Sequence, residues 1–291
     1  MLSGMALIRI LKRDAPALKS PVVVAAFDGW VDAGRAATTA GEQLAEGGAL
    51  AATFDADAIF DYRSRRPMLD IVDGSLIGLE WPELTVRAVR LGERDLLILS
   101  GPEPDYRWRE LATEVVAMVQ QFEATTWISL GAIPVATPHT RPVRVLGTAS
   151  ASGLLPPEVT QGPEGTLRVP SALVSVLELA VARARIPALG FFAQVPHYIS
   201  AAYPNASIAL LEHVGRFLGI EPPLGTLPQK ALETRSLLDA ATTADDSTKA
   251  YVARLEEMAD EARLPEGDDL IADIERFLRE RGGGPGSGRP N

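Results

Sequence analysis

Short apolar runs alternate with longer amphipathic runs along this chain, and this alternation restricts its fold more than any other feature. The run Val22–Phe27 is apolar at every position, whereas a strand with one face in water would alternate apolar and polar residues. Such a strand needs helices on both faces of its sheet. An Ala-rich stretch from Asp32 to Glu46 follows and predicts a helix, which Gly47-Gly48 ends. The pattern predicts an α/β fold.

The same alternation continues to about residue 220. Strands are expected at 7–11, 51–54, 86–91, 96–100, 127–131, 143–146 and 188–195, and helices at 107–122, 171–184 and 206–218. Ser171 and Asn205 are the expected N-caps of the last two helices. This succession of elements predicts a central parallel or mixed sheet between layers of helices.

A Pro-containing stretch after residue 220 marks a boundary. We expect an α/β core domain over 1–220, a linker over 221–244, a helical hairpin over 245–281 and a disordered tail over 282–291. The two hairpin helices are expected at 247–262 and 268–281, where apolar residues recur on one face.

Composition excludes several classes of protein. The chain has 291 residues, no cysteine and a net charge of −10, so disulfides, thiolate metal sites and Cys nucleophiles are excluded. The acidic balance argues against nucleic acid and anionic membranes as partners. The apolar runs are too short to cross a bilayer and the N-terminus has no signal-peptide pattern, so a cytoplasmic protein is expected. Most of the negative charge falls after residue 244, so it does not argue against a small anion bound to the core.

The first candidate site follows the strand at 22–27. Asp28, Trp30 and Asp32 lie where this strand gives way to a helix, and ligands of open α/β sheets gather at such strand ends. Asp28 or Asp32 binds a ligand or acts as a base in one interpretation. In the other, Asp32 caps the helix and Trp30 packs. The glycines here do not have the spacing of a dinucleotide-binding loop.

An arginine cluster is the second candidate. Arg63, Arg65 and Arg66 lie within four residues, a density that suits carboxylate or phosphate recognition. The alternatives are a solvated loop and a subunit contact with acidic residues across it.

Two further loops each follow a predicted buried strand and complete the set. The first holds His139 and Arg141 on a Pro-rich segment, and the second holds His197 and Tyr198. His139 could accept a proton or merely bond to the backbone, and the tyrosines could bind a ligand or pack. Three histidines, one of them in a predicted helix, give no metal site, and no cofactor-binding or nucleophile motif is present.

These stretches together carry a family resemblance. The segments 27–34, 57–67, 131–142 and 196–205 resemble, in this order, those of the proteasome assembly chaperone 2 family in its actinobacterial form. The resemblance implies a phosphorylase/hydrolase-like three-layer α/β fold with a central mixed sheet and a C-terminal helical hairpin. It also implies a homo-oligomer, a trimer, with proteasome subunits as partners.

Two hypotheses for function follow. The first is a non-catalytic, chaperone-like or binding protein of this family that acts as a homo-oligomer. The second is an enzyme or sensor for a small anionic metabolite, with a pocket formed by the loops at the carboxyl ends of the strands. The first is favoured because no recognisable nucleophile, base or metal set is present.

Overall fold

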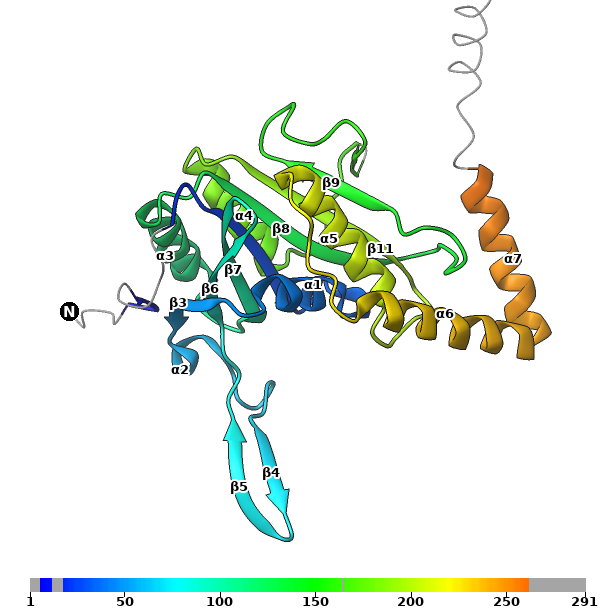
Figure 1. The fold of residues 1–291 in the computed structure, drawn as a ribbon, viewed down its shortest axis with the longest axis horizontal. Coiled ribbons are helices and arrows are strands. Elements are labelled where there is room, and N and C mark those ends of the chain that lie inside the picture. The colour runs from blue at the N-terminus through cyan, green and yellow to red at the C-terminus, as the bar shows by residue number, and fades with distance from the viewer. Residues whose placement is uncertain (1–5, 12–17, 164, 262–291) are drawn as a thin grey trace, which may run out of the picture.

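The computed structural model describes residues 6–11, 18–163 and 165–261 (Figure 1). Nine strands form one mixed sheet in the order β1-β3-β6-β7-β2-β8-β11-β9-β10. Their bounds are β1 Ile8–Ile10, β2 Val22–Asp28, β3 Ala49–Phe54, β6 Thr85–Leu91, β7 Arg94–Pro102, β8 Thr126–Val135, β9 Val145–Ala149, β10 Thr160–Gln161 and β11 Ala188–Pro196.

The four central strands β7, β2, β8 and β11 run parallel. The strands β3, β6 and β7 pair antiparallel, as do β11 and β9. The centre of the sheet is therefore parallel and its flanks contain antiparallel pairs, with β9 and β10 at one edge again parallel, which confirms the expected mixed sheet.

Strand β2 supplies both hydrophobic cores. Val22, Val24 and Ala26 point into one core, and Val23 and Ala25 into the other, because successive side chains of a strand point to opposite faces. All five are at most 6% exposed. The unbroken apolar run thus reflects a strand covered on both sides, as predicted.

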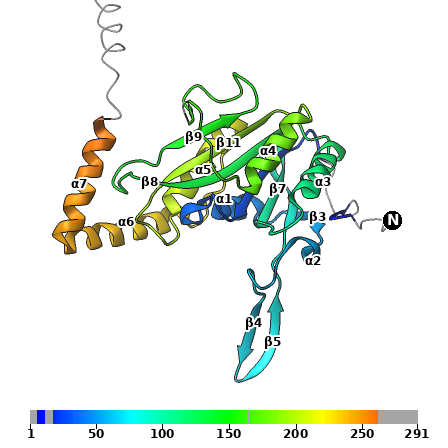
Figure 2. The same cartoon turned by 180° about the vertical axis from the view of Figure 1, so that it is seen from behind.

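Helices cover both faces of the sheet (Figure 2). α1 (Ala36–Ala45) and α5 (Pro204–Leu218) contribute to one core, and α3 (Trp108–Gln121) and α4 (Leu173–Arg183) to the other. Two short helical turns, Ala33–Arg35 before α1 and α2 (Ala56–Ile59) after β3, complete the core domain. The result is the expected three-layer α/β fold.

Two helix starts differ from the sequence predictions. α5 begins at Pro204 with Tyr203 at the N-cap position, so Asn205 lies inside the helix. Pro is well suited to the first helical position, because the N–H it lacks would have no partner within the helix. α4 begins after Ala172, and Ser171 does not cap it; the N–H of Leu173 instead donates to Glu103 Oε1 at 2.6 Å.

The segment predicted as a linker contains a helix. α6 (Leu227–Ala244) packs on α5, and α7 (Asp246–Glu261) packs on α6. Asp245 separates α6 from α7, and its carboxylate accepts the N–H of Thr248 at 2.7 Å, which caps α7. The first helix of the expected hairpin is present as α7. Its expected second helix at 268–281 and the tail at 282–291 lie outside the described residues.

A projecting hairpin is another element that the periodicity did not predict. β4 (Met68–Val72) and β5 (Ser75–Glu80) pair as a separate two-stranded sheet that extends away from the body (Figure 1). Asp73 and Gly74 form its turn, both with positive φ, at 48° and 78°. Asp-Gly between two apolar runs is a strong hairpin signal because a tight type I′ turn requires positive φ at both positions. We call residues 68–80 the arm.

The described helices include none that is both long and apolar enough to cross a membrane.

Candidate functional site

The loops that the sequence singled out meet at one edge of the sheet. β2, β7, β8 and β11 are parallel neighbours, so the loops after them leave the same edge. β3 points the same way as β7, because each pairs antiparallel with β6, so α2 and the arginine cluster after β3 also lie at this edge.

Asp28 and Arg65 join the first two loops. Nη1 of Arg65 lies 3.5 Å from the Asp28 carboxylate, and Nη2 donates to the Asp28 carbonyl oxygen at 2.9 Å. Arg35 approaches the same carboxylate at 3.9 Å. The charge of Asp28 is therefore balanced by two arginines of this chain.

Trp30 is presented to solvent, with 70% of its surface exposed. Its backbone N–H donates to Glu103 Oε2 at 3.3 Å, while the other oxygen of Glu103 holds the N-terminus of α4. Glu103 thus fixes the Trp30 loop to α4. The sequence analysis missed Glu103, which follows β7 and carries no motif.

Asp32 caps α1 from across the preceding helical turn. Its carboxylate accepts the N–H groups of Ala37 at 2.7 Å and Thr38 at 3.2 Å and the hydroxyl of Thr38. Burial raises the pKa of Asp32 to about 6, although the hydrogen bonds from Thr38 and Ala37 oppose the shift. The geometry matches the capping interpretation of Asp32.

Buried His139 and half-buried Tyr198 form a pair between the third and fourth loops. The Tyr198 oxygen accepts the backbone N–H of His139 at 2.8 Å and lies 2.7 Å from Nδ1 of the same residue. In the neutral tautomer with its proton on Nε2, Nδ1 accepts the proton of the Tyr198 hydroxyl. His139 is 2% exposed, and this burial lowers its pKa, so it is neutral at pH 7.

The remaining nitrogen of His139 faces α6. Nε2 lies 3.2 Å from Asp239, whose carboxylate also accepts from Arg235 Nε at 2.8 Å. Arg235 in turn donates to the His139 carbonyl oxygen at 3.1 Å. His139 thus connects the core domain to α6, with each of its ring nitrogens bonded.

Arg141 and His197 contact α7 in the same way. Arg141 donates to both carboxylate oxygens of Asp260, at 2.8 and 2.6 Å, and to Glu256 at 3.2 Å. His197 Nε2 lies 3.1 Å from the Tyr251 hydroxyl. The third and fourth loops therefore form the surface on which α6 and α7 pack.

Arg63 and Arg66 lie apart from this network. Arg63 pairs with Asp61 at 3.2 Å and is 85% exposed, and this hydrogen bonding lowers the pKa of Asp61 to about 2. Arg66 is also exposed. Both residues directly precede the arm.

The candidate residues thus form three separate groups, and the structure does not bring all ten together. Arg65 and Arg141 are paired with carboxylates of the chain, and the ring nitrogens of His139 and His197 have partners within it. Among the described residues, no group of three or more His, Cys, Asp or Glu could hold a metal ion. Cavities of about 570 Å³ beside Tyr62 and Trp81 and about 500 Å³ beside Arg87 and Lys230 are lined by none of the ten.

Comparison with known proteins decides the family. The PAC2 family model matches residues 26–242, most of the chain. The chain belongs to the PAC2 family. No curated protein matches it.

Solved structures agree with this assignment. A proteasome-assembly chaperone homologue of Mycobacterium tuberculosis is 36% identical, with a TM-score of 0.72 over 79% of this chain and 99% of that one. A PAC2 family protein of Streptomyces avermitilis is 35% identical, with a TM-score of 0.72 over 80% of this chain and 99% of that one. A Corynebacterium glutamicum protein of unknown function is 28% identical, with a TM-score of 0.82 over 88% of this chain and 97% of that one.

Proposed function

We propose that this PAC2 family protein is a non-catalytic, chaperone-like protein that acts as a homo-oligomer, a trimer, and binds proteasome subunits. The observation that carries the proposal is the sheet edge itself. Where α/β enzymes keep an open site, this chain packs α6 and α7 over two of the loops, through His139, Arg141 and His197. The side chains that could perform chemistry hold structure together instead.

The family supports a binding role. The M. tuberculosis relative, 36% identical, is described as a proteasome-assembly chaperone homologue. A small-anion enzyme has no such support, because Arg65 and Arg141 are already paired with carboxylates of the chain. The cytoplasmic location stays a prediction.

Trp30 is the residue best placed to contact a partner. Its indole is exposed while its backbone is fixed by Glu103, so presenting it costs little conformational entropy. Tryptophan is enriched among residues that dominate binding energy at protein interfaces. We therefore place Trp30 in the surface that binds the partner.

A direct binding measurement tests the proposal. The full chain is immobilised and exposed to purified proteasome core subunits of the source organism at concentrations up to about 10 μM, where a chaperone-type complex should form. Trp30→Ala is expected to weaken binding by about 10- to 30-fold, the loss typical of an interface tryptophan. Leu179→Ala, which removes an exposed side chain on α4, is the matched control and should bind normally.

Two outcomes would contradict these statements separately. If no core subunit binds the wild-type chain, the proposed partner is wrong. If subunits bind and Trp30→Ala binds equally well, the partner stands but the surface lies elsewhere.

A further inference from the structure

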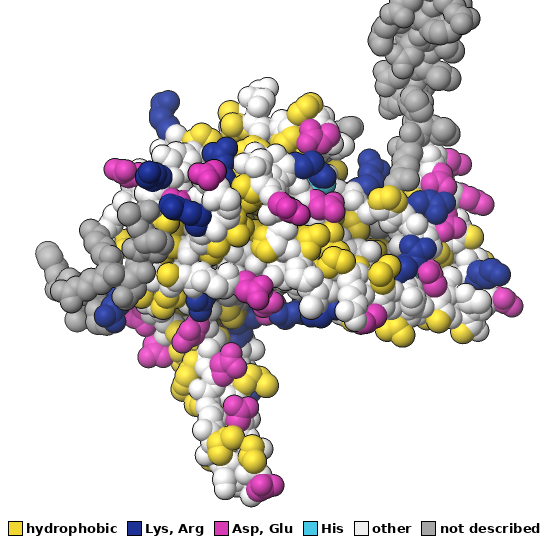
Figure 3. Space-filling model, in the orientation of Figure 1, with side chains coloured by type: hydrophobic (Ala, Val, Ile, Leu, Met, Phe, Trp, Pro, Cys, Tyr) yellow, Lys and Arg dark blue, Asp and Glu magenta, His cyan; other side chains and the backbone are white. Residues whose placement is uncertain are grey.

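A cavity of about 570 Å³ lies where the arm joins the body. It is formed by the end of β3, the start of α2 and the start of β6, and it is lined by Thr53 and Thr85, which are cross-strand partners on β3 and β6. Figure 3 shows acidic and hydrophobic side chains together at this junction. The volume is typical of sites for small molecules, so the cavity has room for a ligand.

Three carboxylates line this cavity. Asp55 and Asp57 lie at the start of α2, and Glu83 lies between the arm and β6. In the part of the chain that the structure describes, none of the three forms an ion pair with Lys or Arg. Arg107, whose charge acts on Asp55, is bound to Glu110. The cavity therefore holds negative charge that no described Lys or Arg pairs with.

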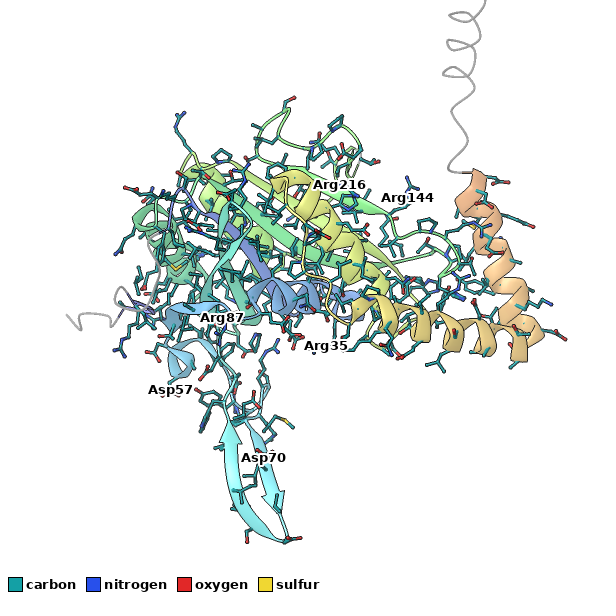
Figure 4. All side chains as sticks on the ribbon, viewed as in Figure 1. Arg35, Asp57, Asp70, Arg87, Arg144 and Arg216 are labelled. Carbon is teal, nitrogen blue, oxygen red and sulfur yellow. The ribbon has the colours of Figure 1, made fainter. Side chains whose placement is uncertain are left out.

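Two aromatic rings lie beside these carboxylates. Tyr62 precedes the arm and Trp81 follows it, and their rings pack edge to face with centroids 4.7 Å apart. The Tyr62 hydroxyl donates to Asp57 of α2 at 2.6 Å, which holds this ring at the cavity (Figure 4). Burial, this hydrogen bond and the nearby charge of Asp55 raise the pKa of Tyr62 to about 12, as expected where the potential is negative. Trp81 is 45% exposed, so part of its ring surface is open to a ligand.

This combination suits an organic cation better than a metal ion. Among the described residues, no three acidic or other metal-binding side chains are grouped closely enough to hold a metal ion, so the three carboxylates do not converge on one point. An organic cation does not need convergent oxygens: its ammonium groups donate to separate carboxylates, and its methylene groups lie against the rings. A cation over the face of Trp or Tyr gains a further attraction.

We propose that this cavity binds an aliphatic polyamine, a flexible chain that carries two or more ammonium groups. The ammonium groups pair with Asp55, Asp57 and Glu83, and the methylene segments between them lie on Tyr62 and Trp81. Several charges on one chain match several separate carboxylates, whereas a single Lys side chain of a partner protein would leave the other carboxylates unpaired. The site goes beyond the proposed function, because no contact with core subunits is needed to form it.

Isothermal titration calorimetry of the full chain with spermidine, a triamine, tests the proposal. Spermidine is expected to bind one site with a dissociation constant below about 1 mM at low ionic strength. Butylamine, which has one ammonium group, should bind at least about tenfold more weakly, because it pairs with one carboxylate at a time. Raising the salt concentration to about 0.5 M should weaken spermidine binding, since salt screens charges in a cavity open to solvent.

Neutral variants of nearly equal shape locate the bound amine. Asp57→Asn/Glu83→Gln should weaken spermidine binding by at least about tenfold, because two of the three charges are lost. Asp70→Asn/Asp73→Asn is the matched control: it removes two charges from the arm, outside the cavity lining, and should bind within about twofold of wild type. Trp81→Leu should weaken binding about threefold, since it removes the cation–π attraction.

The variants are expected to stay folded, which the urea midpoint checks. After Asp57→Asn, the amide oxygen of the asparagine still accepts from the Tyr62 hydroxyl. Glu83 is exposed, and its carboxylate makes no ion pair with the described residues, so Glu83→Gln removes no such contact. A loss of binding at an unchanged midpoint therefore reports on the site.

The proposal is wrong if spermidine shows no saturable binding up to about 10 mM, or if butylamine binds as tightly as spermidine. It is also wrong if Asp57→Asn/Glu83→Gln or Trp81→Leu binds as the wild type does. Displacement of spermidine by an equal concentration of Mg²⁺ would show a general attraction for cations rather than a site for an amine, and would overturn the proposal as well. Core-subunit binding is measured separately with Trp30→Ala, so failure of this site leaves the proposed function standing.

Discussion

Single residues fix the loop between β2 and α1. Gly34 has φ +63°, and a Cβ at this position would lie 2.8 Å from Cβ of Tyr203. The carbonyl oxygen of Gly34 also accepts the N–H of Tyr203 at 2.8 Å. The loop therefore binds the start of α5 closely, and only glycine satisfies both the dihedral angle and the space.

Gly34→Ala should lower the free energy of unfolding by at least about 2 kcal/mol. The added methyl group would lie too close to Tyr203, and alanine is strained in the left-handed backbone conformation. Gly47→Ala is the matched control: Gly47 has φ +70° but open space around it, so only the dihedral cost of about 1 kcal/mol is expected. Urea denaturation measures both. Equal losses would show that the contact with Tyr203 is unimportant.

Asp32 should make stability depend on pH. Its pKa is about 6 in the folded chain, against 3.8 for an ordinary aspartate. The folded state therefore binds a proton more tightly than the unfolded state. The raised pKa adds about 2–3 kcal/mol to the free energy of unfolding below pH 4. This added stability is lost as the pH rises to about 6 and the carboxyl group ionises. Asp32→Asn removes the titration while keeping the shape of the side chain.

The measurement is the unfolding free energy of wild type minus that of Asp32→Asn across pH 4–7. The difference should fall with rising pH and then level off. Parallel profiles of the two proteins would contradict the raised pKa of Asp32.

At the scale of elements, α6 is bound through a small polar network around buried His139 rather than a broad apolar face. Only Leu227 and Ala231 of α6 are buried. Arg235 and Asp239 supply the polar contacts to His139. The attachment of α6 therefore depends on the geometry of the His139–Tyr198 pair.

Tyr198→Phe should destabilise the chain by about 1–3 kcal/mol, because the N–H and Nδ1 of buried His139 both lose their partner. Tyr251→Phe removes a hydroxyl from a 42%-exposed ring that contacts His197 and should cost under about 0.5 kcal/mol. Hydrogen exchange of residues 227–244 should rise in Tyr198→Phe alone. Similar exchange in both variants would mean that the network does not hold α6.

At the scale of the whole molecule, the body and the arm differ in how they treat their apolar side chains. The body buries its apolar side chains in two cores on either side of the sheet. The arm exposes its own, and its strands are absent from both cores. Folding is therefore a property of the body, because the arm adds no side chain to either core.

Replacing residues 68–80 with a short Gly/Ser linker should leave the urea midpoint within about 0.3 M of wild type, because the arm adds almost no buried surface to a single copy. The measurement is made at low protein concentration, since association would stabilise the wild type. A large drop in midpoint would show that the arm supports the body.

The sequence alone determined the layers of this protein and the edge at which its loops meet. Those features follow from local periodicity, since the unbroken apolar run of β2 and the helical repeat of α3 indicate which faces are buried. The loops then lie at one edge because the strands before them are parallel. Even the arm was signalled locally, by Asp73-Gly74 between apolar runs.

Only the tertiary structure decided which partners the loop residues take. Arg65 meets Asp28, Arg141 meets Asp260 and His139 meets Asp239, at separations of 37, 119 and 100 residues. No local pattern predicts such pairs. The charge of a side chain indicates the type of group it can bind, but the fold decides which distant carboxylate lies beside it. For the same reason the sequence did not indicate that His139, Arg141 and His197 contact α6 and α7.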